Sequence, residues 1–257
     1  MLPPVSLQLL YPLALAEGEG IGVAYDYFVR RRLLAQWLKT RPRPRRLLIA
    51  GLPERYGFSL DFFLLAQEWS AELVVLDERP RRLEKSAKAF AAAQRQGYFH
   101  NLTPTYLPVS DLIQLPELTG TFDLTLSSEV LQRIPPEWLP RYWQNLWQRS
   151  TSIALFAPNA DNPSHPTYSD LQGVYLNDMY TFALMAAECS IKIGYMDIPP
   201  FPPGVSRSPS QREQLQVGRV SWLAMTFLEG YARLEPYFSQ RWSRGRAHNV
   251  YTLATHP

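Results

Sequence analysis

Apolar residues follow two alternating patterns along the first part of the chain. Short continuous apolar runs predict buried strands at residues 46–51, 72–77, 103–109, 121–127 and 152–157. The segments between them repeat apolar residues every three or four positions, which predicts helices at 24–40, 58–69, 81–96 and 138–149. Because strands and helices alternate strictly, we expect a parallel sheet with helices on both faces.

The pattern changes after Pro158. Residues 158–171 are rich in Asn, Asp, Pro, Ser and His, which predicts a loop over the sheet edge. A helix is predicted at 174–188 and a strand at 190–198, and the proline-rich residues 199–210 are incompatible with regular structure. The chain then reads as largely helical over 211–241 and ends in a short alternating strand at 249–254.

Two strand ends carry candidate chemistry. The first strand stops at Gly51, where a tight turn leads into the next helix, and the second strand ends in Asp77. An acid at the tip of the second strand is placed to accept both hydroxyls of a ribose that lies over the first turn. Gly51 and Asp77 together predict a bound nucleoside. Taken alone, Gly51 is better explained as a tight-turn glycine and Asp77 as a solvated strand end or a helix cap.

Composition narrows the class of protein. At 257 residues with 46% hydrophobic content, the chain suits one large domain. Cys189 is the single cysteine, so a disulfide framework and a multi-cysteine metal site are excluded and no metal is predicted. Residues 1–16 are apolar without a preceding basic residue, which favours a cytoplasmic protein over a secreted one, and no run reaches the roughly 18 apolar residues of a membrane span.

The phrase from Phe122 to Pro135, FDLTLSSEVLQRIP, is the most specific motif. With the strand-turn-helix at Gly51 and the acid Asp77, it resembles the class I S-adenosylmethionine-dependent methyltransferases over about residues 45–157. The resemblance implies an α/β, Rossmann-like, seven-stranded and mostly parallel sheet with helices on both faces. It also implies an N-terminal helical lead-in and a C-terminal helical insertion.

The resemblance implies a binding site for S-adenosylmethionine, whose product is S-adenosylhomocysteine. Gly51 and its turn look like the loop under the methionine part, Asp77 like the ribose acid and Asp111 like the acid that binds the adenine amino group. The residues that the resemblance places at the cofactor are Tyr27, Gly51, Leu52, Pro53, Glu54, Asp77, Glu78, Asp111, Leu112, Ser127 and Ser128.

The chain departs from the family pattern at three places. Ile49 stands where an acid is usual, and Leu52-Pro53-Glu54 replaces the second glycine region, with Pro53 removing a backbone donor. Glu54 is a candidate to restore an acidic contact to the cofactor's amino group. Gln132-Arg133 stands where Glu-His is frequent, so a histidine base is not expected at that position.

Methyl transfer from a sulfonium needs positioning and exclusion of water more than a covalent nucleophile. Glu129 and His165 are the candidate general bases, with Asp161 or Asp170 as further candidates. A surface-loop histidine is the alternative for His165. Residues 17–27 mix glycines, acids and tyrosines, and two explanations stay open: a lid over the site, or a flexible helix start with Tyr27 in the core.

The leading functional hypothesis is methyl transfer to a small-molecule acceptor. Its first alternative is a catalytically inactive methyltransferase-like binding or assembly module. Arginine clusters at residues 30–32, 41–46 and 241–246 prompt a second, weaker alternative, a nucleic-acid methyltransferase. Four aromatic residues predict an apolar or planar acceptor unless they serve core packing: Tyr168, Tyr175, Tyr180 and Phe201. No membrane partner is expected. The predicted organisation is a helical lead-in or lid at 1–45 and an α/β domain at 46–257, with insertions at about 158–172 and 199–245. The sequence does not define the methylated atom or the oligomeric state.

Overall fold

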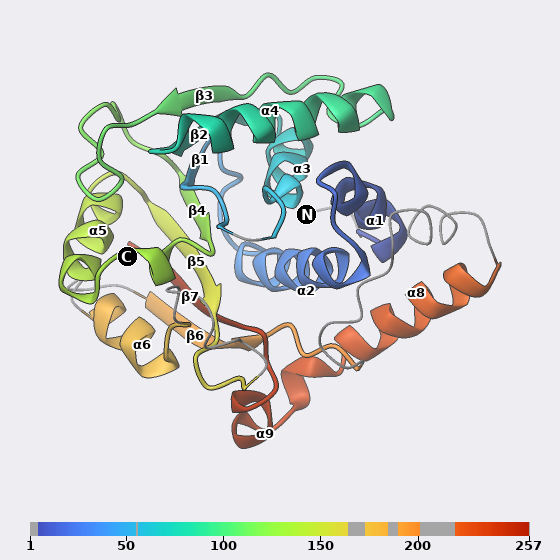
Figure 1. The fold of residues 1–257 in the computed structure, drawn as a ribbon. Coiled ribbons are helices and arrows are strands. Elements are labelled where there is room, and N and C mark those ends of the chain that lie inside the picture. The colour runs from blue at the N-terminus through green and yellow to red at the C-terminus, as the bar shows by residue number, and fades with distance from the viewer. Residues whose placement is uncertain (1–4, 55, 164–172, 185–189, 201–218, 257) are drawn as a thin grey trace.

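Seven strands form one sheet in a computed structural model that describes residues 5–54, 56–163, 173–184, 190–200 and 219–256 (Figure 1). The strands are β1 (Arg46–Ala50), β2 (Glu72–Asp77), β3 (Thr105–Pro108), β4 (Leu124–Ser128), β5 (Ser152–Pro158), β6 (Ser190–Met196) and β7 (Asn249–Thr255). Their spatial order is β3-β2-β1-β4-β5-β7-β6, and only β7 runs antiparallel to its neighbours. The predicted seven-stranded, mostly parallel sheet is therefore confirmed.

The strand order reverses between β1 and β4. From β1 the chain moves outward to β2 and β3, then returns to place β4 on the other side of β1, with Leu48 paired to Val74 on one side and to Thr125 on the other. In open α/β sheets the crevice at the carboxyl ends of strands beside such a reversal is the usual ligand site. The ends of β1, β2 and β4 are therefore the place to look for a functional site.

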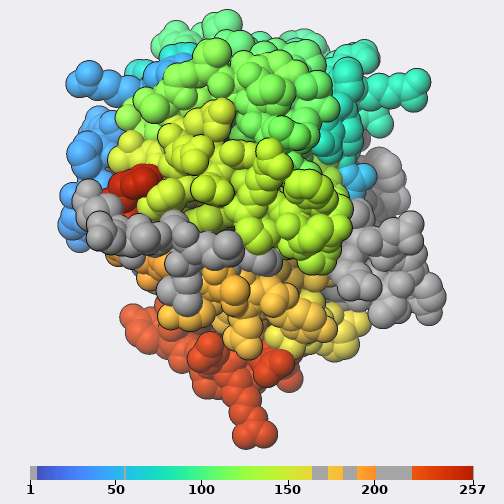
Figure 2. Space-filling model, turned by 90° about the vertical axis from the view of Figure 1, so that its left-hand side faces the viewer, coloured from blue at the N-terminus to red at the C-terminus, as the bar shows by residue number. Residues whose placement is uncertain are grey.

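Helices cover both faces of the sheet, as predicted (Figure 1). One face packs against α1 (Leu7–Ala16), α2 (Ile21–Trp37), α3 (Leu60–Trp69) and α4 (Pro80–Arg95). The other packs against the segment after β3, the short turn η1 (Leu131–Arg133), α5 (Leu139–Trp147) and α6 (Leu176–Leu184). Figure 2 shows this second face, with the green and yellow-green residues up to α5 above the orange α6.

The C-terminal helical insertion lies between β6 and β7. It contains α8 (Arg219–Ala232), the single turn η4 (Glu235–Tyr237) and α9 (Gln240–Arg244). Helix α8 packs against α1 and α2, where Met225 and Leu228 join the core of the first face. None of the described helices is long and apolar enough to cross a membrane.

The strands that position the site are buried on both faces. Leu47, Leu48, Ile49 and Ala50 of β1 are all buried, and β2 is buried from its second residue to its last. This is why both read as continuous apolar runs rather than alternating ones. Pro80 opens α4 and Gly97 follows it, as the sequence indicates.

Two local expectations need correction. Helix α1 was not predicted, because Pro12 interrupts the apolar pattern, yet the helix continues through Pro12 and buries Leu10, Tyr11 and Leu13. The helix predicted at 138–149 begins at Leu139, and Trp138 lies on the turn before it with 42% of its surface exposed.

Candidate functional site

The turn after β1 requires glycine. Gly51 has φ +83°, in the left-handed region that side-chain-bearing residues rarely adopt. A Cβ at this position would lie 2.8 Å from a methyl group of Val130 and 2.9 Å from Nη2 of Arg133. The close approach shows that the segment after β4 lies directly on the turn.

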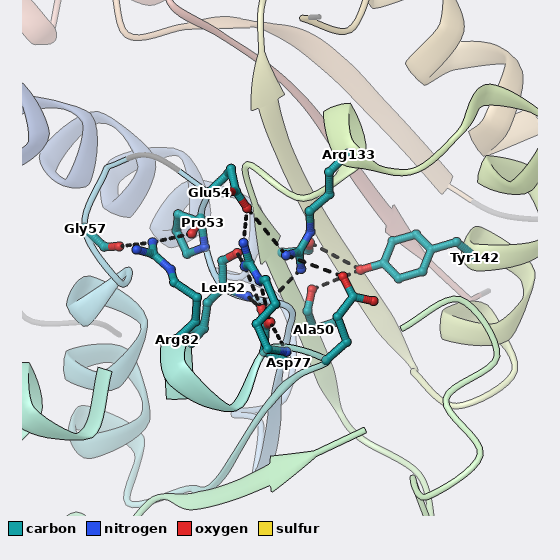
Figure 3. A network of polar contacts seen from close by, with 12 residues as sticks. Ala50, Leu52, Pro53, Glu54, Gly57, Asp77, Arg82, Arg133 and Tyr142 are labelled. Carbon is teal, nitrogen blue, oxygen red and sulfur yellow. Dashed lines mark hydrogen bonds and ion pairs between the residues drawn. The ribbon is translucent and has the colours of Figure 1, made fainter. Parts of the chain in front are cut away.

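Asp77 lies at the end of β2, beside this turn, with its side chain fully buried. Its Oδ2 accepts the backbone N–H of Leu52 at 2.7 Å, which ties the end of β2 to the glycine turn (Figure 3). Arg79 adds a two-point contact, from Nε to Oδ1 at 2.7 Å and from Nη2 to Oδ2 at 2.9 Å. Arg133 donates from Nη2 to Oδ2 at 3.2 Å, so the carboxylate is compensated by two arginines.

Glu54 belongs to the same network. Its Oε2 pairs with Arg79 and lies 3.8 Å from Nη1 of Arg133, which in turn is 3.7 Å from Oε1 of Glu78 (Figure 3). Arg133 is 9% exposed, whereas Glu54 is 35% and Glu78 is 38% exposed. The site therefore holds alternating acids and arginines, with Glu54 and Glu78 on its solvent side and Asp77 at its base.

The turn is braced from both of its ends. Tyr142 of α5 donates its hydroxyl to the carbonyl of Ala50 at 3.0 Å, and burial raises the pKa of that hydroxyl, so it stays protonated (Figure 3). Arg82 of α4 donates to the carbonyls of Pro53 and Gly57 (Figure 3). These contacts fix the backbone that a ligand would lie against.

Asp111 follows β3 at the same edge of the sheet. Its Oδ1 accepts the backbone N–H groups of Ile113 at 2.7 Å and Gln114 at 2.9 Å, so one carboxylate oxygen caps the turn that follows. Leu112 is buried and packs in the core of the second face. Asp111 thus has a structural role, and its role toward adenine stays a prediction.

The end of β4 contributes three residues named from the sequence. Ser127 is buried and lies 3.4 Å from the Tyr142 hydroxyl. Ser128 accepts a hydrogen bond from Nη1 of Arg30 at 2.7 Å, which connects β4 to α2. Glu129 is half-buried and has φ +54°, a strained conformation for a residue with a side chain. The strain at Glu129 marks the point where the chain leaves the sheet for η1.

The N-terminal segment reaches the other end of the glycine turn. Tyr27 of α2 is buried, accepts the N–H of Ser59 at 3.1 Å and donates to Oε2 of Glu17. Oε1 of Glu17 accepts the N–H of Leu60 at 2.8 Å, at the first turn of α3. Burial raises the pKa of Glu17 to about 8, with the hydrogen bonds from Tyr27 and the backbone opposing the shift. Tyr27 is thus in the core, and its contact with a cofactor stays a prediction.

A cavity of about 410 Å³ opens between this segment and α4. Glu17 and Glu19 line one side of it, Arg82, Lys85 and Lys88 the other, and Gly57 and Phe58 lie between. Since the raised pKa leaves Glu17 largely protonated at neutral pH, the charge of this lining is net positive.

Of the remaining candidate bases, Asp161 accepts a hydrogen bond from Nη2 of Arg244 at 2.8 Å. His165 and Asp170 lie outside the residues that the structure describes. No group of three His, Cys, Asp or Glu residues suited to a metal ion is found among the described residues. Sequence reasoning missed Arg79, Arg82 and Tyr142, because only the tertiary fold brings them to the turn.

Solved structures of methyltransferases share this fold. No protein-family model and no curated protein matches the sequence. The methyltransferase domain of bacterial CtHen1 aligns with a TM-score of 0.54 and 12% identity, covering 90% of this chain and 98% of that one. Magnesium protoporphyrin IX methyltransferase from Synechocystis PCC 6803, with bound S-adenosylhomocysteine (SAH), aligns with a TM-score of 0.51 and 13% identity over 91% and 87% of the two chains. The plantazolicin methyltransferase BamL, in complex with a triazolic desmethyl analogue and SAH, aligns with a TM-score of 0.51 and 9% identity over 96% and 95%.

These likenesses establish the fold. Each of the three alignments covers at least 90% of this chain and at least 87% of the matched one. The chain therefore has the class I methyltransferase fold, as the phrase from Phe122 to Pro135 predicts.

Proposed function

We propose that this protein binds S-adenosylmethionine at the carboxyl ends of β1, β2 and β3 and transfers its methyl group to a small-molecule acceptor. One observation carries the proposal: the fully buried Asp77 lies beside a glycine turn at the strand-order reversal of a methyltransferase fold. The solved methyltransferases that share the fold, two of them with bound SAH, support the same ligand class.

The residues present fit this ligand in type and position. Gly51 lets the segment after β4 lie directly on the turn, Asp77 offers a buried carboxylate to a ribose hydroxyl, and Asp111 offers Oδ2 to an exocyclic amine. Arg133 covers Gly51 and Asp77 in this structure. Its long side chain can rotate away without moving the backbone, so binding requires a rotamer change rather than refolding.

S-adenosylmethionine supplies an electrophilic methyl group on a sulfonium. The protein's own contribution is to hold both partners and exclude water. Asp77 orients the ribose, Leu52 holds Asp77 through its backbone N–H, and Ser127 and Ser128 fix the end of β4 beside the turn. Among the described residues, Glu129 is the candidate general base that would take a proton from the substrate that receives the methyl group.

Calorimetry with SAH tests the proposal. We expect wild-type protein to bind SAH and Asp77→Asn to bind it at least about tenfold more weakly, since an ionised acceptor makes hydrogen bonds stronger by roughly 1 kcal/mol or more. Asp123→Asn is the matched control: Asp123 caps the start of β1 at the opposite edge of the sheet, by accepting the N–H groups of Arg45 and Arg46. It should leave the affinity unchanged.

The alternatives give different results in the same assay. A methyltransferase-like module without cofactor chemistry predicts no SAH binding by folded wild-type protein, which would refute the proposal. A nucleic-acid methyltransferase predicts SAH binding together with RNA or DNA binding that weakens with added salt.

A further inference from the structure

Arg133 occupies the place that the amino acid end of the cofactor requires. It comes from η1, just after β4, and its Nη2 lies 2.9 Å from the position that a Cβ on Gly51 would take. Nη2 reaches Asp77 at 3.2 Å, and the side chain is only 9% exposed. A buried cation therefore rests on the turn that the resemblance places under the methionine part.

The turn itself offers an anion no free backbone donor over residues 51–53. The N–H of Gly51 donates to the carbonyl of Leu76 at 3.0 Å, and the N–H of Leu52 donates to Asp77. Pro53 has no N–H. A carboxylate placed over these three residues must find its donors on a side chain.

Arg133 has such donors in reserve. Its Nε and Nη1 are buried and make no hydrogen bond within the described structure. The carboxylates nearest to Nη1 lie at 3.8 Å in Glu54 and 3.7 Å in Glu78, which is ion-pair distance but beyond a hydrogen bond. Unpaired buried N–H groups are costly, so an acceptor that reaches them gains binding free energy.

We propose that Arg133 binds the α-carboxylate of the cofactor and that the neighbouring Glu54 binds its α-ammonium group. This assignment rests on the proposed function. A Glu–Arg pair presents the charges complementary to a zwitterionic amino acid. Arg133 thereby supplies the donor that Pro53 cannot.

Binding then exchanges partners without leaving a buried charge alone. Arg133 leaves Oδ2 of Asp77 for the ligand's carboxylate, and one ribose hydroxyl takes its place on that oxygen. Arg79 keeps its two-point contact with Asp77 throughout. Because every charge keeps a partner, the exchange avoids the large penalty of an isolated buried ion.

Two ligands that differ only in the amino acid end test the assignment. SAH carries that end, whereas 5′-methylthioadenosine has the adenine, ribose and thioether without it. We expect Arg133→Met to weaken SAH binding by about tenfold or more, the loss typical of a charge-assisted hydrogen bond. It should leave 5′-methylthioadenosine binding unchanged or strengthen it, because Arg133 no longer competes for Asp77. Calorimetry measures both.

Two further variants act as controls. Arg133→Lys retains the charge and should recover part of the SAH affinity. Arg141→Met removes an exposed arginine of α5 and should change neither ligand. Wild-type protein offers a test that needs no variant: it should prefer SAH over its α-carboxamide by about tenfold or more.

The outcomes separate the two proposals. If Arg133→Met raises the affinity for both ligands equally, Arg133 only competes with the ligand for Asp77. That result would overturn the assignment but leave the proposed function standing. Unchanged SAH affinity, or no wild-type preference for the carboxylate over the carboxamide, would do the same. If wild-type protein binds neither ligand, the proposed function fails and the assignment with it.

Discussion

Arg30 forms the most deeply buried ion pair in the described structure, and removing it gives a quantitative test of how the N-terminal helices are held. From α2 it donates Nε to Oδ2 of Asp61 at 2.9 Å and Nη2 to Oδ1 at 2.7 Å, while Nη1 donates to Ser128 at 2.7 Å. Arg30 is 1% exposed and Asp61 is fully buried. One side chain thus joins α2, α3 and the end of β4.

We expect Arg30→Met to lower the free energy of unfolding by about 3–5 kcal/mol, the usual cost of leaving one partner of a buried pair uncompensated. For a chain of this size, that corresponds to a fall in Tm of roughly 6–20 °C. The guanidinium carbon of Arg30 also lies 5.0 Å from the ring centroid of Tyr27 and 4.5 Å from that of Phe62. Methionine removes these cation–π contacts together with the ion pair but keeps an apolar side chain, so the loss is mainly electrostatic.

The loss should grow with pH. Burial raises the pKa of Asp61 above its ordinary value, and the Arg30 charge opposes this shift. Without Arg30 the folded-state pKa rises further, so the unfolded chain ionises first as the pH increases. In this window the folded state holds more protons, and stability therefore falls with rising pH up to the folded-state pKa. Below the unfolded-state pKa, Asp61 is protonated in both the folded and the unfolded state, so its ionisation no longer contributes to the loss of stability.

Urea unfolding followed by tryptophan fluorescence at pH 5 and pH 8 measures both effects. Lys88→Met is the control, because the Lys88–Glu84 pair is 73% and 62% exposed and its loss should cost less than about 0.5 kcal/mol. The double variant Arg30→Met with Asp61→Leu removes the fully buried one of the two acids that pair with Arg30, the other being Asp26 at 3.4 Å, and should regain a large part of the stability. A loss below about 1 kcal/mol in the single variant, or no recovery in the double one, would refute the reasoning.

Three further substitutions have defined outcomes. Gly51→Ala should lower the free energy of unfolding by about 1–3 kcal/mol in a denaturant titration, because Gly51 has a positive φ and a Cβ there would contact Val130. The control is Gly230→Ala in α8, where a Cβ would have no atom within 4 Å, and it should be neutral or stabilising. Equal effects of the two substitutions would contradict this prediction. The raised pKa of Glu17, about 8, makes the stability of the wild-type protein fall between about pH 4.5 and 8. Glu17→Gln removes this titrating group, so its stability should rise relative to that of the wild type across the same window. Parallel profiles of stability against pH would exclude the raised pKa. Asp111→Ala should lower the free energy of unfolding by about 1 kcal/mol, because the cap on the following turn is lost. If the carboxylate also binds adenine, Asp111→Ala should lower the affinity for SAH more than Asp111→Asn does. Equal SAH affinities in the two variants would mean that Asp111 is only a cap.

The sheet was predictable because burial on both faces leaves a direct trace in the sequence. The apolar runs of β1 and β2 end at Gly51 and Asp77, and the structure ends these strands at Ala50 and Asp77. Boundaries were less exact where polar residues enter the pattern: β4 begins at Leu124, since Phe122 forms only an isolated bridge with Ser150. Helix α1 was missed because its burial against α2, α3 and α8 outweighs the local cost of Pro12.

The candidate site was predictable in its acids but not in its arginines. Asp77 has a fixed relation to the strand that carries it, so its place follows from the strand end. Arg79 and Arg133 have long side chains whose directions depend on charges contributed by distant segments, and Glu54 is close to Arg133 only in the folded chain. In the sequence, Arg133 was noted only because it stands where the family frequently has a histidine.

The arginines also change what the altered glycine turn means. Loss of the second glycine and of the Pro53 donor weakens a turn that must bind an anion through its backbone, and on that basis the sequence leaves room for an inactive module. With Arg133 on the turn, the required positive charge comes from a side chain instead. Measured affinity would then be the net of new ligand contacts and the Arg133–Asp77 contact that binding breaks. Because a buried pair is nearly balanced between its desolvation cost and its Coulomb energy, this exchange costs little. Truncating Arg133 should therefore separate the two ends of the ligand, weakening recognition of the amino acid while freeing the acid that holds the ribose.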